Sequence, residues 1–476
     1  MLVKRNLFIN GQWKEAAKYN ALYAPFSGER IADVGHANDA DTEEAIQAAV
    51  AAADKMASLS AYQRTTILSK AADILETRKE ELARLLALEA AKPIKTARGE
   101  IARTIQTYRF AAMEASRIHG ETVPLDAAPG GEGRIAFTLR KPLGVVAAIT
   151  PFNFPFNLVA HKVGPAIAAG NTIVLKPAGQ TPLSSLVLAE VFQEAGLPDG
   201  ALNIIPGPGA VVGEKLVRDP RIKAVTFTGS PAVGIAMKNK AGLKRVTLEL
   251  GSNSALIIDH TVEITDELID RCVLGAFSFS GQVCISIQRI LVHESTYECF
   301  LNQYKAKVEK LVIGDPLNES TDMSAMIHEK EVTRMQEWVD SAVMRGAHVV
   351  TGGTALNSRI FPPTILTNVA ADEPVSCEEV FGPIVIVSSF STLEQAINEV
   401  NHSRFGLQAG IYTHDIHSAM HAAEKLEVGG VMINDFPTFR VDNMPYGGVK
   451  ESGFGREGVQ YAVEEMTEMK LITIKL

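Results

Sequence analysis

Residues 145–155 read VVAAITPFNFP, an uninterrupted apolar run that ends in a turn with two prolines. Similar short apolar runs follow downstream and alternate with segments of helical length. Runs without polar alternation are typical of strands covered on both faces, so this order predicts a parallel sheet with helices on both sides. The expected strands are Val145–Ile149, Thr172–Leu175, Leu202–Ile205, Ala224–Phe227 and Ala255–Ile258, and the expected helices are Leu183–Ala195, Ala210–Arg218 and Ala232–Lys240.

A second alternating stretch follows residue 284 and predicts a second α/β lobe. Its expected strands are Arg289–His293, His348–Thr351, Ile384–Ser388 and Gly430–Ile433. Before residue 120 the chain is expected to be helical after a short strand-like entry, and Asp41 with Glu44 forms a capping-box pattern. Arg134–Leu139 and Lys470–Leu476 stand outside both lobes and resemble edge strands that need a partner.

Charge and composition favour a protein that acts on a small molecule. The chain has 476 residues, of which 46% are hydrophobic and 21% are charged, as in an ordinary folded protein. Its net charge is −9 and its Lys and Arg residues are scattered, which argues against nucleic acid or a membrane surface as a partner. The window Pro142–His161 lacks charged residues, but its prolines and asparagines favour a strand, a turn and a helix start over a membrane span.

The cysteine pattern indicates a reducing compartment. Four cysteines are present, with no CxxC spacing and no adjacent His cluster, which argues against a metal site and against a disulfide framework. The apolar part of the N-terminal segment 1–12 is too short for a signal peptide. We therefore expect a cytoplasmic protein without a metal.

One of these cysteines has the setting of a nucleophile. Cys284 ends the polar, small-residue turn GQVC at 281–284, directly after the helix-like segment Asp266–Phe279. An accessible sulfur in such a turn is what a thiolate nucleophile requires. Cys272 and Cys299 fall in amphipathic helical patterns and are expected to be small buried hydrophobes.

Glu249 and Asn153 are candidate catalytic groups, each with a plain structural alternative. Glu249 stands between two leucines; burial there would raise its pKa and suit a general base, whereas exposure would make it a solvated residue at a strand end. Asn153 lies between two prolines in a rigid turn. Its amide could hold a developing oxyanion, or it could only bond to the turn backbone.

Two glycine-containing loops follow consecutive expected strands. The first, Gly207-Pro208-Gly209 with Gly213, has one residue too many for a GxGxxG fingerprint. The second, FTGS at 227–230, joins a strand to a helix start, where a phosphate can bind. Each alone is consistent with a tight turn, but together they indicate a dinucleotide.

Seven strings spread over nearly the whole chain resemble the aldehyde dehydrogenase superfamily and occur in that family's order. They are TPFNFP at 150–155, KPA at 176–178, FTGS at 227–230, LELG at 248–251, GQVC at 281–284, EEVFGP at 378–383 and PYGGVKESGFG at 445–455. The resemblance implies an NAD(P)-dependent, non-acylating enzyme of the lactaldehyde, semialdehyde or non-phosphorylating glyceraldehyde-3-phosphate group. It also implies a Rossmann-like cofactor domain, a second α/β catalytic domain and a small β oligomerisation domain.

The same resemblance assigns roles to matched positions. It implies that Cys284 is the nucleophile, that Glu249 is the base for deacylation, and that Asn153 and the Cys284 backbone N–H form the oxyanion hole. Lys176 resembles the contact to the adenosine ribose, Ser230 the contact to the pyrophosphate and Glu379 the contact to the nicotinamide ribose. The other residues expected beside the cofactor are Thr150, Pro151, Gly179, Gly209, Phe227, Gly229, Leu250 and Phe381, the last packing near the nicotinamide ring.

The domain boundaries and assembly also come from the resemblance. Residues 1–118 and 142–250 are expected to form the dinucleotide-binding domain, and 251–453 the catalytic domain. Segments 119–141 and 454–476 are the expected oligomerisation segments of a homodimer or homotetramer. Gly179 stands where strict NAD users often carry a Glu, so the expected cofactor is NAD or NADP.

The substrate is expected to be a small polar aldehyde, such as a lactaldehyde-like hydroxyaldehyde or a semialdehyde, because few aromatic residues fall in the expected entrance. Three arginines are candidates to bind an anionic group of the substrate: Arg103, Arg289 and Arg440. Phe154 is an expected substrate contact. Each Arg could instead belong to a surface or inter-subunit ion pair.

Two other functions remain to be weighed. In a CoA-acylating dehydrogenase a thiol takes the acyl group, and Glu249 in the position of a base argues against it. A catalytically idle structural or binding protein would show erosion at Cys284, Glu249 or Asn153, and all three are present.

Overall fold

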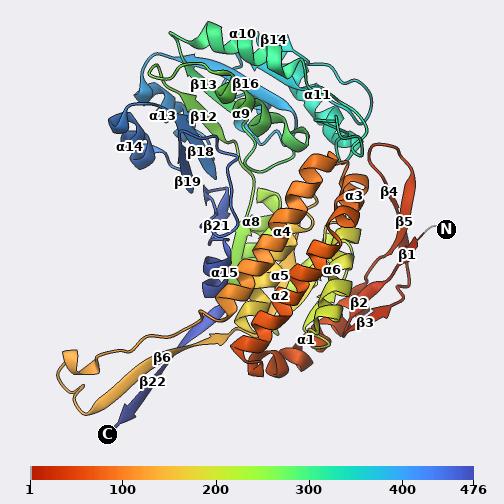
Figure 1. Ribbon diagram of the computed structural model, residues 1–476, viewed down its shortest axis with the longest axis vertical. Coiled ribbons are helices and arrows are strands. Elements are labelled where there is room, and N and C mark those ends of the chain that lie inside the picture. The colour runs from red at the N-terminus through yellow and green to blue at the C-terminus, as the bar shows by residue number, and fades with distance from the viewer. Residues whose placement is uncertain (1–2) are drawn as a thin grey trace.

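The computed structural model describes residues 3–476 and contains two α/β lobes and a projecting pair of strands (Figure 1). The first lobe is built on an eight-stranded sheet whose middle strands run parallel. In sheet order its strands are β21 (Gly453–Phe454), β11 (Arg245–Glu249), β10 (Ile222–Thr228), β7 (Val145–Ile149), β8 (Thr172–Lys176), β9 (Leu202–Ile204), β2 (Leu7–Ile9) and β3 (Gln12–Lys14).

Helices cover both faces of this sheet. Successive side chains of a strand point to opposite sides, and here the side chains on both sides are apolar and need cover. In β7, Val146 and Ala148 belong to one hydrophobic core, whereas Val145 and Ala147 belong to another. The helices of the lobe are α1 (Asp39–Ser58), α2 (Ala61–Thr77), α3 (Lys79–Ala90), α4 (Ile94–Ala115), α5 (Asn157–Ala169), α6 (Pro182–Ala195), α7 (Glu214–Arg218) and α8 (Pro231–Lys240).

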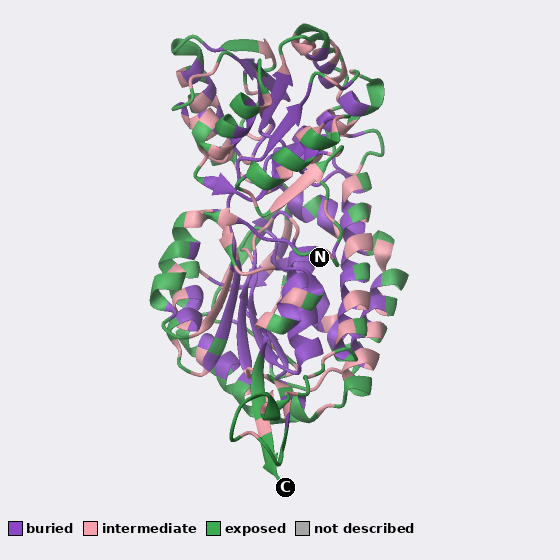
Figure 2. Ribbon diagram, turned by 90° about the vertical axis from the view of Figure 1, so that its left-hand side faces the viewer, coloured by how far each residue is buried: buried purple, intermediate pink, exposed green. Residues whose placement is uncertain are grey.

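The second lobe has a seven-stranded sheet, parallel except for the first strand. In sheet order its strands are β14 (His348–Thr351), β15 (Thr364–Thr367), β16 (Ile384–Phe390), β13 (Arg289–His293), β12 (Ala255–Ile258), β18 (Gln408–Tyr412) and β19 (Gly430–Ile433). Its helices are α9 (Asp266–Phe277), α10 (Tyr297–Val308), α11 (Glu329–Met344), α12 (Pro374–Cys377), α13 (Leu393–Asn401) and α14 (Ile416–Lys425). Figure 2 shows that the central strands of the sheets are buried.

Two segments far apart in the sequence form the projecting arm. β6 (Arg134–Pro142) and β22 (Thr467–Lys475) pair antiparallel along their whole length (Figure 1). The two segments expected to be edge strands are therefore strands, and each is the partner of the other. The smaller elements are the 3₁₀ turn Leu125–Ala127, α15 (Val459–Glu465), the pair β17 (Phe405–Gly406) and β20 (Val449–Lys450), and a three-stranded sheet of β1 (Val3–Arg5), β5 (Arg30–Gly35) and β4 (Tyr19–Tyr23).

The mixed α/β architecture and most expected strands are confirmed, but Ala255–Ile258 lies in the second sheet, not in the first. Five residues, 250–254, connect β11 to β12, whereas a parallel crossover within one sheet needs a dozen or more residues. The short connection therefore carries the chain into the other lobe.

Three local predictions were wrong. Residues 3–35 contain five strands, not a short strand-like entry. The capping box of α1 consists of Asn38 and Asp41, because the helix starts at Asp39 and Asp41 occupies its third position. The expected helix Ala210–Arg218 begins as the single π turn Gly209–Gly213 and is α-helical only over α7. Across residues 3–476, every helix is too short or too polar to cross a bilayer.

Candidate active site

The carboxyl edge of the first sheet gathers several of the expected site residues. Ile149 of β7 pairs with Lys176 of β8, and Thr228 of β10 pairs with Glu249 of β11. Parallel strands end at a common edge, which is where α/β sheets bind their ligands. Thr150, directly after β7, stands at the same edge.

Lys176 and Ser230 supply free polar groups beside this edge. Lys176 is buried, and burial lowers the pKa of its amine; within residues 3–476 its Nζ donates one hydrogen bond, to the Pro177 carbonyl at 3.2 Å. Ser230 is the N-cap residue of α8, and its hydroxyl makes no capping bond. A buried amine without a carboxylate partner and a helix N-terminus both favour an anionic ligand.

The FTGS loop packs closely, and two of its neighbouring positions require glycine. A Cβ on Gly229 would lie 2.6 Å from the Phe227 ring, and one on Gly234 would lie 2.4 Å from Leu250. Glycine therefore lets this strand–helix joint approach a ligand with its backbone. The Thr150 hydroxyl is buried and has no hydrogen-bond partner in the described part of the chain.

Glu379 and Phe381 lie on the other lobe and face the same loops. One carboxylate oxygen of Glu379 accepts a hydrogen bond of 2.9 Å from the Ser252 N–H, and burial raises its pKa to about 7. Phe381 contacts Phe152 edge-on, with ring centroids 5.8 Å apart, and thus packs on the turn that carries Asn153.

The loops also leave room for a bound group. Gly179 and Gly209 have open space where a Cβ would stand. Pro151 follows Thr150, whose N–H is bonded to the Lys176 carbonyl at 3.2 Å. Unpartnered buried groups, a helix N-terminus and glycine-lined loops between the two lobes fit a dinucleotide.

The Cys284 turn is shaped by left-handed backbone. After α9 the residues Phe279, Ser280 and Gly281 have φ values of 50°, 54° and 68°. A Cβ on Gly281 would lie 2.2 Å from the Gly382 carbonyl oxygen, so only glycine fits there. The turn leaves the Cys284 side chain half-buried at the wall of a cavity.

Asn153 is joined to this turn. Its side-chain Nδ2 donates a hydrogen bond of 3.0 Å to the Gln282 carbonyl, and its Oδ1 is buried without a partner in the described residues. An amide has two N–H donors, so one remains to face an oxyanion. Lys92 fixes the turn that carries Asn153: its Nζ donates a hydrogen bond of 2.6 Å to the Asn153 carbonyl and pairs with Glu100. The side chains of Lys92 and Glu100 are fully buried.

Glu249 is buried, so the alternative of a solvated strand-end residue is wrong. Neither carboxylate oxygen has a hydrogen-bond partner among the described residues. Burial raises the pKa of Glu249 well above its usual value, and the negative charge of Glu457 raises it further, whereas Arg440 and Lys162 oppose the rise. A carboxylate left free in a buried site suits a general base that holds a water molecule.

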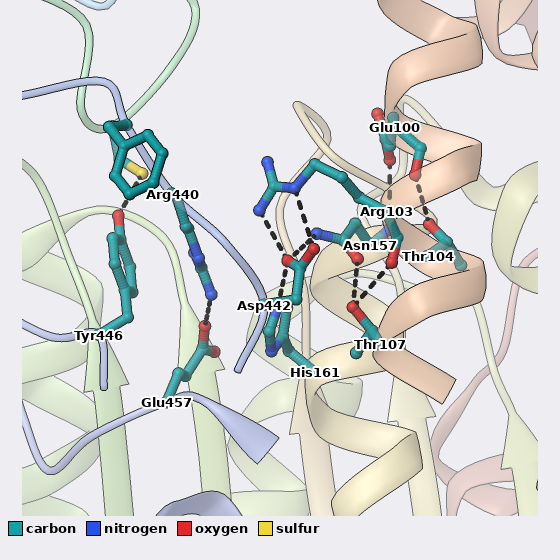
Figure 3. Close-up of polar contacts among 12 residues, drawn as sticks. Glu100, Arg103, Thr104, Thr107, Asn157, His161, Arg440, Asp442, Tyr446 and Glu457 are labelled. Atoms are coloured by element: carbon teal, nitrogen blue, oxygen red, sulfur yellow. Dashed lines mark hydrogen bonds and ion pairs between the residues drawn. The ribbon is translucent and has the colours of Figure 1, made fainter. Parts of the chain in front are cut away.

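Arg440 and Cys284 are connected through one aromatic ring. The Arg440 guanidinium lies 3.6 Å from the centre of the Tyr446 ring, and the Tyr446 hydroxyl lies 3.0 Å from the Cys284 sulfur (Figure 3). Arg440 also donates to Glu457 at 3.1 Å, and Glu457 pairs with the buried Lys162 at 2.7 Å. The Arg440 side chain is 5% exposed, so the alternative of a surface ion pair does not describe it.

Arg103 is held beside the same cavity by Asp442 (Figure 3). Its Nε and Nη2 donate to the two carboxylate oxygens at 3.2 and 2.7 Å. Asp442 also accepts from the Asn157 amide at 3.0 Å and pairs with His161 at 2.9 Å. Burial opposes ionisation of Asp442, but His161 and Arg103 hold its pKa well below the usual range. The loop that carries Arg440 is thereby fixed to α4 and α5.

The cavity has a volume of about 720 Å³ and joins the thiol to both arginines. Its lining includes Phe154, Phe277, Thr438, Arg103, Arg440 and Cys284. Arg289 lies elsewhere: its guanidinium donates to the carbonyls of Asn253, Glu399 and Val400, which explains its burial without a carboxylate.

Sequence reasoning missed Tyr446, Asp442, Glu457 and Lys162. Tyr446 lies inside the PYGGVKESGFG string and Asp442 in the segment that carries Arg440, but neither pattern reveals which partner the side chain meets. The expectation of a buried Cys299 was also wrong, because Cys299 is exposed and α10 buries Phe300 instead.

Known proteins resemble this chain along nearly its whole length. Residues 13–472 match the model of the aldehyde dehydrogenase family. A 3-sulfolactaldehyde dehydrogenase of Priestia megaterium is 48% identical over 99% of this chain and 98% of that one, and a lactaldehyde dehydrogenase of Methanococcus aeolicus is 40% identical over 98% and 99%. Aldehyde dehydrogenase 21 of Physcomitrella patens, solved in complex with the reaction product succinate, superposes with a TM-score of 0.97 at 41% identity and covers 100% and 99% of the two chains.

Other solved structures that match nearly the whole chain are complexes with NADP or with NAD⁺. The fold, the seven strings and the similarity along the whole chain lead to one conclusion. The chain belongs to the aldehyde dehydrogenase family and is an NAD(P)-dependent oxidoreductase.

Proposed function

We propose that this enzyme oxidises a small aldehyde with an anionic group at its far end, such as a sulfonate or a carboxylate, to the carboxylic acid. The observation that carries the proposal is that Arg440 and Arg103 line the same cavity as Cys284. Each arginine is oriented by a carboxylate partner and neither lies free on the surface. A guanidinium binds planar anions through paired N–H donors, which suits recognition of such a group.

The names of similar proteins support an anionic substrate. The Priestia relative is named for 3-sulfolactaldehyde, which carries a sulfonate, and the Physcomitrella enzyme holds succinate, a dicarboxylate, as its product. The Methanococcus relative is named for lactaldehyde, which is neutral. The neutral hydroxyaldehyde is therefore the alternative that the experiment below distinguishes.

In the proposed mechanism the Cys284 thiolate adds to the aldehyde carbon. The developing oxyanion accepts hydrogen bonds from the free N–H of the Asn153 amide and from the Cys284 backbone N–H. NAD or NADP, held by Lys176, Ser230 and Glu379, would supply the hydride acceptor for the oxidation of the Cys284 adduct to a thioester. Preorganised donors of this type are worth about 2.7–4 kcal/mol each in acyl-transfer sites.

Glu249 is assigned the hydrolysis of the thioester. Its unpartnered carboxylate removes a proton from a water molecule, which attacks the acyl carbon and releases the acid and the thiol. Because this base is built into the site, we assign water and not CoA as the acyl acceptor. The presence of Cys284, Glu249 and Asn153 in the chain also argues against an idle protein on the same fold.

The test is NAD(P)H absorbance with 3-sulfolactaldehyde, succinate semialdehyde, lactaldehyde and propanal, each with and without CoA. We expect the two anionic aldehydes to give the highest kcat/KM, a carboxylic acid as product and no requirement for CoA. A rate that depends on CoA would assign the enzyme to the acylating class. Highest kcat/KM with propanal would exclude anion recognition.

We also propose that the β6–β22 arm joins this chain to a second copy, in a homodimer or homotetramer. The arm projects from the first lobe (Figure 1). Four apolar side chains on it are exposed: Ile135, Met469, Leu471 and Ile474. The division into domains at residues 118, 142, 250 and 453 stays a prediction. The four free cysteines support a reducing compartment, and we propose the cytoplasm.

A further inference from the structure

The Tyr446 hydroxyl has an unusual neighbour for a buried phenol. Tyr446 is 3% exposed, and its hydroxyl lies 3.0 Å from the Cys284 sulfur. Within residues 3–476 this is the one hydrogen bond that the hydroxyl makes. The other bonds of Tyr446 are made by its backbone, to the backbone of Glu457. Buried hydroxyls normally have a partner, and here the partner is the atom assigned to react.

Two neighbours, Tyr446 and Arg440, favour a negative sulfur against the effect of burial, and the phenol keeps its proton. The positive Arg440 lies on the face of the Tyr446 ring at 3.6 Å. Burial raises the pKa of Cys284 to about 11, and Glu379 and Glu249 contribute to the rise, whereas the Tyr446 hydrogen bond and Arg440 keep that pKa lower than it would be without them. Burial also raises the pKa of Tyr446 well above 10, so the phenol remains a donor.

We propose that Tyr446 is a catalytic residue whose hydroxyl donates a hydrogen bond to the Cys284 thiolate and so holds the nucleophile ready, with Arg440 on the ring adding its positive charge. The thiol proton leaves to solvent through the cavity, and Tyr446 keeps its own proton. When the sulfur bonds to the aldehyde carbon it loses its negative charge, and the hydrogen bond weakens. The role in turnover rests on the proposed function of Cys284.

The substitution Tyr446→Phe isolates the hydroxyl. The ring that supports Arg440 stays, and the removed oxygen leaves no other hydrogen-bond partner among the described residues unsatisfied. A hydrogen bond to a charged group is strong enough to move the midpoint of thiol ionisation by about one to two pH units. We therefore expect the thiolate fraction of the variant to be about 10–100-fold smaller below that midpoint.

The experiment measures the rate of iodoacetamide alkylation of Cys284 against pH, by mass spectrometry of its own peptide because Cys299 and Cys377 are also exposed. The expected result is an alkylation rate about 10–100-fold lower in Tyr446→Phe at each pH below the wild-type midpoint, with a parallel loss of kcat/KM. The matched control is Tyr304→Phe, which removes a buried, unpartnered hydroxyl in the core of the second lobe and should change neither profile.

Two results would overturn the inference: an unchanged alkylation profile in Tyr446→Phe, or a loss of kcat/KM without slower alkylation, which indicates packing alone. Thermal melting confirms that the variant is folded. The outcome is separate from the proposed function, because alkylation reports the contact itself, whereas Cys284→Ala tests whether the thiol is the nucleophile. Aldehyde oxidation by Cys284→Ala at the wild-type rate would remove that role and leave the measured contact standing.

Discussion

Lys92 donates a hydrogen bond of 2.6 Å to the backbone carbonyl of Asn153, and both residues are buried. The partner of Lys92, Glu100, accepts from the N–H groups of Phe156 and Asn157, at 3.0 and 3.2 Å. One buried ion pair thus holds both ends of the turn that presents the Asn153 amide. The oxyanion donor is positioned from α4, far away in the sequence.

We expect Lys92→Met to lower the free energy of unfolding by about 3–5 kcal/mol, because the Glu100 carboxylate is left buried without its cation. The double substitution Lys92→Met with Glu100→Gln removes the charge and should recover part of that stability. Its kcat should remain low, because the Asn153 turn has lost its support. Thermal melting and steady-state kinetics separate the two effects; full recovery of kcat in the double variant would show that the pair acts on stability alone.

Glu249→Gln is expected to keep a burst of NAD(P)H on rapid mixing but to turn over slowly, because hydride transfer precedes the step that needs the base. Stopped-flow absorbance measures both phases. If the burst disappears together with turnover, Glu249 acts before hydride transfer.

The same variant predicts a pH-dependent stability. The pKa of Glu249 is raised in the folded state above its unfolded value of about 4.3, so the folded protein binds the proton more tightly and wild-type stability falls as pH rises above that value. Gln has no charge to bury. Melting curves should therefore show a larger stabilisation by Glu249→Gln at pH 8 than at pH 5, and an equal difference at both would contradict burial of the charge.

Arg440→Ala should raise KM for anionic aldehydes far more than for propanal. A hydrogen bond to a charged group is worth about 1.5–3 kcal/mol, or roughly 10–150-fold. Because Arg440 also touches Tyr446, a loss common to all aldehydes is expected as well, and the ratio of kcat/KM between anionic and neutral substrates carries the information. A ratio that stays at the wild-type value would remove Arg440 from substrate recognition.

Gly179 predicts that both cofactors are used. A carboxylate at this open position would accept bonds from the ribose hydroxyls of NAD and repel the 2′-phosphate of NADP, and glycine does neither. Lys176, which has no carboxylate partner, remains free to pair with a phosphate. Gly179→Glu should lower kcat/KM for NADP and spare or improve NAD; a wild-type enzyme more than about a thousandfold selective for NAD would contradict the prediction.

Deletion of Lys470–Leu476 should give smaller assemblies or insoluble protein, because β6 would lose most of its partner strand. Sedimentation velocity measures the outcome. If the truncated chain sediments as the full-length protein does, the arm is not an assembly element.

Much of the fold could be predicted because its central strands are continuous apolar runs. Val145–Ile149 and Arg289–His293 have the predicted bounds. The N-terminal strands were missed because they are short and partly exposed, so they lack an apolar run. The prediction that Ala255–Ile258 joins the first sheet was wrong, because an apolar run indicates a buried strand but does not indicate which sheet the strand belongs to.

Only the part of the candidate site that lies within short local sequence motifs could be predicted. The strings identified Cys284, Glu249 and Asn153, whereas the charges that tune them come from distant parts of the chain. Lys162 and Glu457 are 295 residues apart and form a buried pair, and Arg103 and Asp442 are 339 apart. Such pairs leave no periodic pattern, because the fold alone brings them together.

The most direct test of the claim that this aldehyde dehydrogenase recognises an anionic group of its substrate compares 3-sulfolactaldehyde with lactaldehyde, which differ only by the sulfonate. We predict that kcat/KM of the wild-type enzyme is at least about tenfold higher for 3-sulfolactaldehyde, since one charge-assisted hydrogen bond from Arg440 or Arg103 accounts for that factor. Equal values, or a preference for lactaldehyde, would contradict the account.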